Sequence, residues 1–231
     1  MSDIRVALVA EGLTDAVIIE AALKALLPRA FVLTLVQPEA HPGPTGAGWG
    51  GVLRWCYDFS NRGIEKLEDD PTLPDFDLFV IQADSDISGF KYADVGPQVA
   101  ELAAAENWPA LPASCSCPPA TGCADAVRAC LLAWTRLTVP GERTVLCVPA
   151  MAPEAWIVAA VFRTDHTIHT NLECNRNLGN QLANLSKKER IKKRLVEYRT
   201  IGPTITAKWT QVRAICTEAE RFSQDVQAIR Y

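Results

Sequence analysis

The stretch Leu78-Phe-Val-Ile-Gln-Ala-Asp84-Ser-Asp86-Ile-Ser-Gly combines a short apolar block with two carboxylates placed one residue apart. The block is rich in β-branched and aromatic residues and does not alternate, which is typical of a strand buried on both faces in a parallel sheet. Ligands of open α/β sheets bind outside the carboxyl ends of the strands. Asp84 and Asp86 are therefore expected at that edge, where they could hold a divalent cation or could simply form an Asp-rich turn.

A similar unit opens the chain. Residues 4–9 form an apolar run, an acidic glycine-containing turn follows, and residues 16–27 have apolar side chains at helical spacing until Pro28 ends them. Further strands are expected at 31–36 and 143–148, and further helices at 95–106 and 124–137. This order predicts an α/β fold with a mainly parallel four-stranded sheet flanked by helices.

The two acidic motifs, Glu11-Gly-x-x-Asp15 and Asp84-x-Asp86-x-x-Gly, occur in this order, each at the end of a predicted strand. Together they resemble the motifs of the TOPRIM (topoisomerase–primase) family. The resemblance implies a Rossmann-like metal-binding domain in which Asp84 and Asp86 hold Mg²⁺ or Mn²⁺ and Glu11 is a general acid/base or a bridging ligand. It makes Asp15 and Glu154 further candidate ligands, although Glu154 also suits the first turn of a helix for electrostatic reasons alone.

This domain is expected over residues 1–165, with an insertion at about 38–74, because family members usually keep the two motifs closer together. The insertion contains Gly46-x-Gly-x-x-Gly51, which matches the dinucleotide-binding pattern. That fingerprint should directly follow the first strand and open a helix, whereas nine residues separate it here from the second strand. A substrate-facing or linking loop is expected instead, with Trp49 available to stack on a base or to pack on the core.

Residues 166–231 are expected to form a helical region, with helices at about 176–185, 186–198 and 207–229 and a break near Gly202-Pro203. Residues 187–213 carry nine basic and two acidic residues, within a chain whose net charge is −4. A basic tract beside an acidic site is typical of enzymes that act on nucleic acids, but it also fits an ordinary solvated helix face. The candidate phosphate-binding residues are Lys187, Lys188, Arg190, Lys192, Lys193 and Arg194.

The chain has eight cysteines and no recognisable signal peptide, and no apolar run approaches the ~18 residues that a membrane span needs. A cytoplasmic protein with reduced, buried thiols is therefore expected. One segment, Cys115-x-Cys117-x5-Cys123, also resembles part of a zinc site. Tetrahedral zinc needs four ligands, commonly with Cys pairs two to four residues apart, so a structural zinc site competes here with a packed loop of free thiols.

Carboxylates are hard oxygen ligands that suit Mg²⁺ or Mn²⁺, and such a site supports metal-assisted attack on a phosphodiester. The chain shows none of the accessory regions of a topoisomerase or a primase, so the resemblance implies a small Mg²⁺-dependent nuclease, acting on DNA rather than RNA. It further implies the effector of a prokaryotic anti-phage defence system, with any ATPase as a separate subunit because no Walker A sequence is present. The alternatives are a non-catalytic binding or regulatory subunit and a metal-dependent phosphohydrolase acting on small nucleotides.

Overall fold

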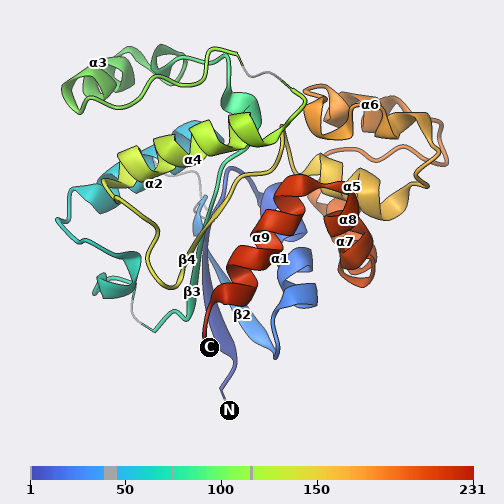
Figure 1. Ribbon diagram of the computed structural model, residues 1–231, viewed down its shortest axis with the longest axis horizontal. Helices are drawn as coiled ribbons and strands as arrows, with labels where there is room; N and C mark the ends of the chain where they lie inside the picture. Colours follow the sequence, from blue (N-terminus) through green and yellow to red (C-terminus); the bar gives the residue numbers. More distant parts are fainter. Residues whose placement is uncertain (1, 39–45, 74, 115–116) are drawn as a thin grey trace.

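The computed structural model describes residues 2–38, 46–73, 75–114 and 117–231. Its sheet consists of β1 (Ile4–Val9), β2 (Phe31–Gln37), β3 (Leu78–Gln82) and β4 (Thr144–Cys147), all parallel, in the order β2-β1-β3-β4. The α/β architecture that the sequence predicts is therefore confirmed, and it is consistent with a Rossmann-like fold. Figure 1 shows both termini at the end of the sheet where the strands begin.

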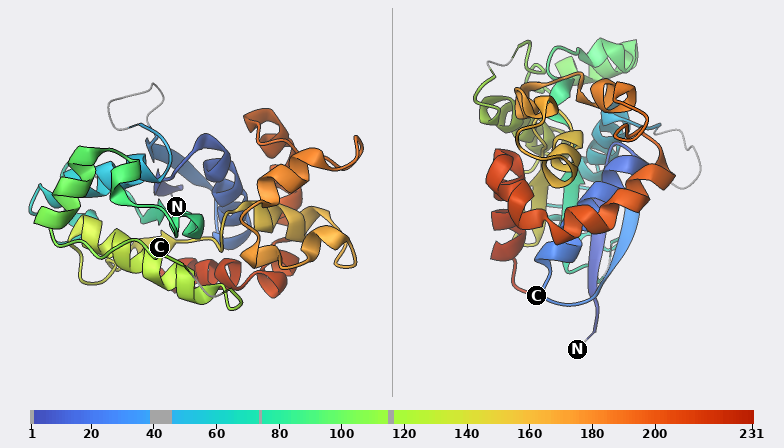
Figure 2. Two further views of the ribbon diagram at one scale, coloured as in Figure 1. Left: turned by 90° about the horizontal axis from the view of Figure 1, so that it is seen from above. Right: turned by 90° about the vertical axis from the view of Figure 1, so that its right-hand side faces the viewer.

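Helices cover both faces of the sheet (Figures 1 and 2). One side carries α1 (Leu13–Leu26), α5 (Glu154–Val161), α7 (Leu195–Ala207), α8 (Trp209–Ile215) and α9 (Thr217–Ala228). The other side carries α2 (Trp49–Ser60), α3 (Pro97–Ala105) and α4 (Thr121–Thr135), and the short α6 (Leu178–Asn184) lies beyond the carboxyl ends of the strands. None of the helices in the described ranges is both long enough and apolar enough to cross a bilayer.

Alternate side chains of the central strands enter two separate cores. Leu8 and Val80 face the core that contains α1, whereas Val9 and Ile81 face the core that contains α2 and α4. Because both faces are buried, the strands are apolar without alternation. The first core also contains Phe222 and other residues of the C-terminal helices, so residues on both sides of position 165 share one hydrophobic core.

The basic residues 187–194, which we call the basic turn, do not form the helix predicted at 186–198. They form a turn and an irregular segment, and α7 begins only at Leu195. Ile191 is the one buried residue of the basic turn, and its N–H donates to the Leu182 carbonyl at 3.0 Å. A stretch with a single buried side chain has no apolar stripe on which a helix could pack, and its like charges repel.

The break predicted near Gly202-Pro203 is also wrong, because α7 continues through Pro203 to Ala207. Tertiary packing holds this part of the helix. Thr206 Oγ1 donates to the Ala21 carbonyl at 2.8 Å, and α7 lies along α1. Packing against a neighbouring helix therefore outweighs the local preference of Gly and Pro to end a helix.

The expectation of reduced thiols holds for four buried cysteines and is wrong for Cys117, Cys123 and Cys174. Cys117 forms a disulfide with Cys174. The free thiols in the described ranges are Cys56, Cys130, Cys147 and Cys216, and Cys123 is not among them. A disulfide sulfur is not a thiolate ligand. Cys117 is therefore not available as a thiolate to a zinc site at Cys115, Cys117 and Cys123, and Cys115 itself lies outside the described residues.

Candidate functional site

The two acidic motifs meet at the carboxyl edge of the sheet, where the order of the strands reverses. The chain passes from β1 to β2 on one side and then crosses β1 to place β3 on the other side. This is the topological switch point, at which open α/β sheets bind their ligands. Glu11 follows β1 and Asp84 follows β3, and the register that pairs Val9 with Ile81 brings these two ends level.

One hydrogen bond joins the two motifs directly, and two more join them through Gln82. The Glu11 N–H donates to Gln82 Oε1 at 2.9 Å, and Gln82 Nε2 donates to Asp84 Oδ1 at 2.6 Å. The Asp84 N–H in turn donates to Glu11 Oε1 at 2.7 Å. The side chain of Glu11 is therefore directed toward the second motif and not away from it.

Asp15 and Glu154 bring two further carboxylates to the same place, from the first turns of α1 and α5. Both residues are almost fully buried, with exposed fractions of 3% and 1%. Asp15 Oδ1 and Glu154 Oε2 have no hydrogen-bond partner, whereas Glu154 Oε1 accepts from the Tyr198 hydroxyl at 2.8 Å. A buried carboxylate oxygen without a partner is costly, so a cation at these atoms would be stabilising. We call the five predicted acids the acidic cluster: Glu11, Asp15, Asp84, Asp86 and Glu154.

An ammonium group of the basic turn reaches the acidic cluster. Lys193 Nζ lies 2.9 Å from Glu154 Oε1 and 3.8 Å from Asp15 Oδ1, and about half of its side chain is exposed. Lys193 is predicted from the sequence as a phosphate-binding residue, whereas the structure pairs it with carboxylates. Burial disfavours its charge, but Glu154 and Asp15 outweigh burial and raise the pKa of Lys193 above its ordinary value. Lys193 therefore connects the basic turn to the acidic cluster.

Four of the five other cations of the basic turn are available to a partner, and the fifth, Lys192, is half-buried. Lys187, Lys188, Arg190 and Arg194 are exposed. Of the cations in the basic turn, only Lys193 forms an ion pair with an acid in the part of the chain that the structure describes. Unpaired cations beside an acidic site suit a polyanion that contacts several of them at once.

Burial raises the pKa of the acids, and their mutual repulsion adds to the effect. Burial raises the pKa of Glu11 to about 8, the hydrogen bond from the Asp84 N–H opposes this, and the charges of Asp86 and Asp15 reinforce it. Burial likewise raises the pKa of Asp15 to about 6 against the attraction of Lys193. The pKa of Asp84 is raised well above its usual range, first by burial and then by Glu11. Lys193 therefore does not fully neutralise the cluster, and a divalent cation would relieve the remaining repulsion.

Three residues of the site are absent from the sequence-based prediction: Gln82, Arg176 and Tyr198. Arg176 Nη1 donates to the Ser88 carbonyl at 2.6 Å, and its other terminal nitrogen donates to the Ser88 hydroxyl. Burial raises the pKa of Asp86, although Lys193 and Arg176 oppose the shift. Gln82 is the one of the three that carries a sequence signal, because it is a polar residue inside an apolar strand.

The glycine-containing loop of the insertion lies against the acidic cluster. The Gly48 N–H donates to the Glu11 carbonyl at 2.8 Å, and a Cβ at Gly51 would approach the Gly46 carbonyl oxygen to 2.7 Å, so glycine is required there. Trp49 packs on the core, where its ring stacks on Trp134 with centroids 6.4 Å apart. Residues 39–45 and 74 of the predicted insertion lie outside the described residues.

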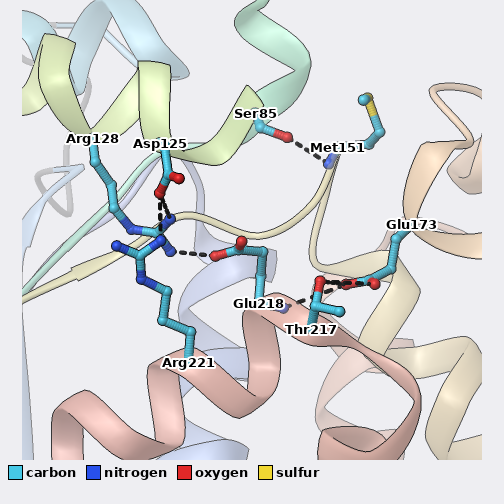
Figure 3. Close-up of polar contacts among 8 residues, drawn as sticks. All are labelled: Ser85, Asp125, Arg128, Met151, Glu173, Thr217, Glu218 and Arg221. Atoms are coloured by element: carbon cyan, nitrogen blue, oxygen red, sulfur yellow. Dashed lines mark hydrogen bonds and ion pairs between the residues drawn. The ribbon is translucent and has the colours of Figure 1, made fainter. Parts of the chain in front are cut away.

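Polar contacts fix the loops that carry the site (Figure 3). Ser85 Oγ accepts from the Met151 N–H at 2.7 Å and so joins the loop after β3 to the loop after β4. Below these loops, Arg128 of α4 forms a buried ion pair with Glu218 of α9. Contacts between loops and between helices on opposite faces of the sheet therefore support this edge of the sheet.

The acidic cluster is not arranged as a ready metal cage. Among the described residues, no three His, Cys, Asp or Glu side chains are placed to hold an ion together. The Lys193 ammonium stands against two of the acids, and Gln82 and the Asp84 N–H engage two others. The donor set nevertheless fits Mg²⁺, because it offers hard oxygens of which two are buried without a hydrogen-bond partner. Binding would require Lys193 to move aside.

Comparison of the chain with protein-family models, with curated proteins and with solved structures gives no match. The case for a function therefore depends on the acidic cluster and the basic turn. Both lie at the edge of the sheet where α/β proteins bind ligands.

Proposed function

We propose that the protein is a Mg²⁺-dependent nuclease of TOPRIM type, with the acidic cluster as its catalytic site. The observation that carries the proposal is the hydrogen bond between Asp84 N–H and Glu11 Oε1, 2.7 Å long and spanning 73 residues of sequence. It brings the two acidic motifs together at the switch point of the sheet.

Glu11, Asp84 and Asp86 would hold the metal, and Asp15 and Glu154 are placed to assist or to hold a second ion. When bound, Mg²⁺ would polarise the scissile phosphate and lower the pKa of a water molecule. In the metal-free protein burial raises the pKa of Glu11 to about 8. If the metal were held by the other acids and left Glu11 free, Glu11 would be the candidate general acid or base.

The basic turn supports a polymeric substrate over a mononucleotide. A mononucleotide offers one cluster of phosphates, whereas a strand offers successive phosphates that can follow the exposed cations away from the acidic cluster. Lys193, at the junction of the two features, is placed to pair with an oxygen of the scissile phosphate once the metal has neutralised the acids. DNA is the proposed substrate. An anti-phage effector that works with a separate ATPase subunit extends the proposal by family analogy alone.

One observation favours a second candidate, a non-catalytic regulatory subunit. Lys193 already fills the position of a cation against Glu154 and Asp15. In that case the ammonium would be a permanent structural counter-ion, and the acidic cluster would not require a metal.

Cleavage of plasmid DNA, single-stranded DNA and RNA in the presence of Mg²⁺ or Mn²⁺ separates the two candidates. Wild-type protein should cut a polymer in a metal-dependent manner, and Glu11→Gln and Asp84→Asn should not. Glu101→Gln, which changes an exposed acid of α3, is the matched control and should retain activity. Equal behaviour of wild type and Glu11→Gln would remove the enzyme proposal, and cleavage of mononucleotides alone would favour a phosphohydrolase.

A further inference from the structure

Gln82 is a fully buried polar side chain at the end of an otherwise apolar strand. The four residues before it in β3 are apolar, and all five residues of the strand are buried. A primary amide in such a place is unfavourable unless both of its ends form hydrogen bonds. Each end of the Gln82 amide is bonded to one of the two acidic motifs.

The orientation of this amide follows from its partners. The Glu11 N–H can only donate, so it requires the amide oxygen, which it contacts at 2.9 Å. The amide nitrogen is then left facing Asp84 Oδ1 at 2.6 Å, where it donates to a carboxylate oxygen. Turning the amide by half a rotation would place its nitrogen against the Glu11 N–H and its oxygen against the Asp84 carboxylate, and both hydrogen bonds would be lost. Gln82 therefore bonds to the two motifs simultaneously.

These contacts constrain the two acids differently. Gln82 fixes the rotamer of Asp84 through one carboxylate oxygen, and the second oxygen of that group keeps its lone pairs for another ligand. Gln82 holds Glu11 through its backbone N–H. The Glu11 side chain in turn accepts a hydrogen bond from the Asp84 N–H, so the three residues are bonded to one another. The amide adds no charge to a cluster that already has five carboxylates. A neutral donor is therefore better suited to this position than a sixth acid or a base.

We propose that Gln82 is a positioning residue, which holds Asp84 and Glu11 in register so that both can bind one divalent cation. The inference rests on the proposed function, since it concerns the same metal. Partners that orient metal ligands in this way typically change metal affinity by about 10–100-fold when they are replaced. A change of that size is expected for Gln82, although its side chain is not a metal ligand.

The test is a titration of the full-length protein with Mn²⁺ alone, in which free Mn²⁺ is followed by electron paramagnetic resonance. Gln82→Met keeps the length of the side chain and removes both hydrogen bonds, so Mn²⁺ should bind about 10–100-fold more weakly than to wild type. Thr144→Val is the matched control, because it removes a buried hydroxyl at the opposite end of the neighbouring strand, where its partner is Glu68. This variant should bind Mn²⁺ as wild type does.

A second readout separates positioning from a general loss of stability. If Gln82 positions the metal ligands, the Mn²⁺ concentration that gives half-maximal DNA cleavage should rise by the same factor as the dissociation constant. DNA affinity in the absence of metal should stay unchanged. Saturating Mn²⁺ should restore most of the wild-type kcat. A role in stability alone would raise the half-saturating Mn²⁺ concentration only by the reciprocal of the folded fraction, which circular dichroism measures, so a larger rise identifies positioning.

The outcomes are distinguishable. If wild type binds no Mn²⁺, the proposed function and this inference are both overturned. If wild type binds Mn²⁺, Glu11→Gln does not, and Gln82→Met binds it with wild-type affinity, the inference alone is overturned. Should Gln82→Met fail to fold, Gln82→Asn takes its place, because it stays polar but is too short to reach both motifs. Unchanged Mn²⁺ affinity in that variant would overturn the inference equally.

Discussion

Replacing Glu11 with glutamine should make the stability of the metal-free protein less sensitive to rising pH. Burial raises the pKa of Glu11 from 4.5 to about 8, so between these values the folded protein keeps a proton that the unfolded chain releases. Each pH unit in this window therefore lowers the free energy of unfolding by about 1.4 kcal/mol. From pH 5 to pH 7 the one group accounts for about 3 kcal/mol on this basis. Glutamine keeps the acceptor for the Asp84 N–H and has no proton to lose.

Urea unfolding, followed by circular dichroism in EDTA at pH 5, 6 and 7, measures this difference. The free energy of unfolding of wild type and of Glu101→Gln should fall together, and that of Glu11→Gln should fall by about 3 kcal/mol less over the range. At pH 7, Mg²⁺ at a hundred times its dissociation constant should raise the free energy of unfolding of wild type by about 2.7 kcal/mol. Parallel slopes for wild type and Glu11→Gln would show that Glu11 titrates as a solvated carboxyl.

Three further predictions concern the scaffold and the basic turn. Arg128→Met should lower the free energy of unfolding by about 3 kcal/mol, because it leaves Glu218 buried without its partner; Arg128→Met with Glu218→Leu should recover most of that stability in the same urea assay. The double variant Cys117→Ser, Cys174→Ser should lower the free energy of unfolding by up to about 4 kcal/mol, as expected for a cross-link between cysteines that are 57 residues apart in the sequence. Unchanged stability would show that the disulfide is not formed in solution. Replacing Lys187, Lys188 and Arg190 of the basic turn with serine should weaken DNA binding. It should also make the logarithm of the binding constant fall less steeply with the logarithm of the salt concentration, by about 0.9 in slope for each phosphate that is no longer neutralised. An unchanged slope would exclude the basic turn from the DNA interface.

The sheet and the meeting of the motifs were predictable because both follow from local patterns. Two apolar runs that each end in acids define two buried parallel strands, and parallel strands place their carboxyl ends at one edge. The proximity of Glu11 and Asp84 along that edge depends, in addition, on the order of the strands. The order β2-β1-β3-β4, which puts these strands side by side, is the arrangement that makes the prediction correct.

The contacts of Lys193, Arg176 and Tyr198 were not predictable, because they depend on how α6 and α7 cross the edge of the sheet. The path of those segments is set by packing on α1 and α5, which no local pattern encodes. The predicted helix at 186–198 failed over the basic turn for a related reason: only Ile191 of residues 187–194 is buried, so this segment has no apolar face that could pack as a helix. Cysteine spacing likewise does not reveal which cysteines pair.

A crystal of the protein soaked with Mn²⁺, in which the ion is located from its anomalous scattering, would show whether the two acidic motifs share one cation. We expect a peak at the ~2.1 Å coordination distance from carboxylate oxygens of both Glu11 and Asp84, with Lys193 Nζ displaced from Glu154. The absence of a peak at saturating Mn²⁺, with Lys193 still in contact with Glu154, would contradict the claim that the two acidic motifs form a metal site.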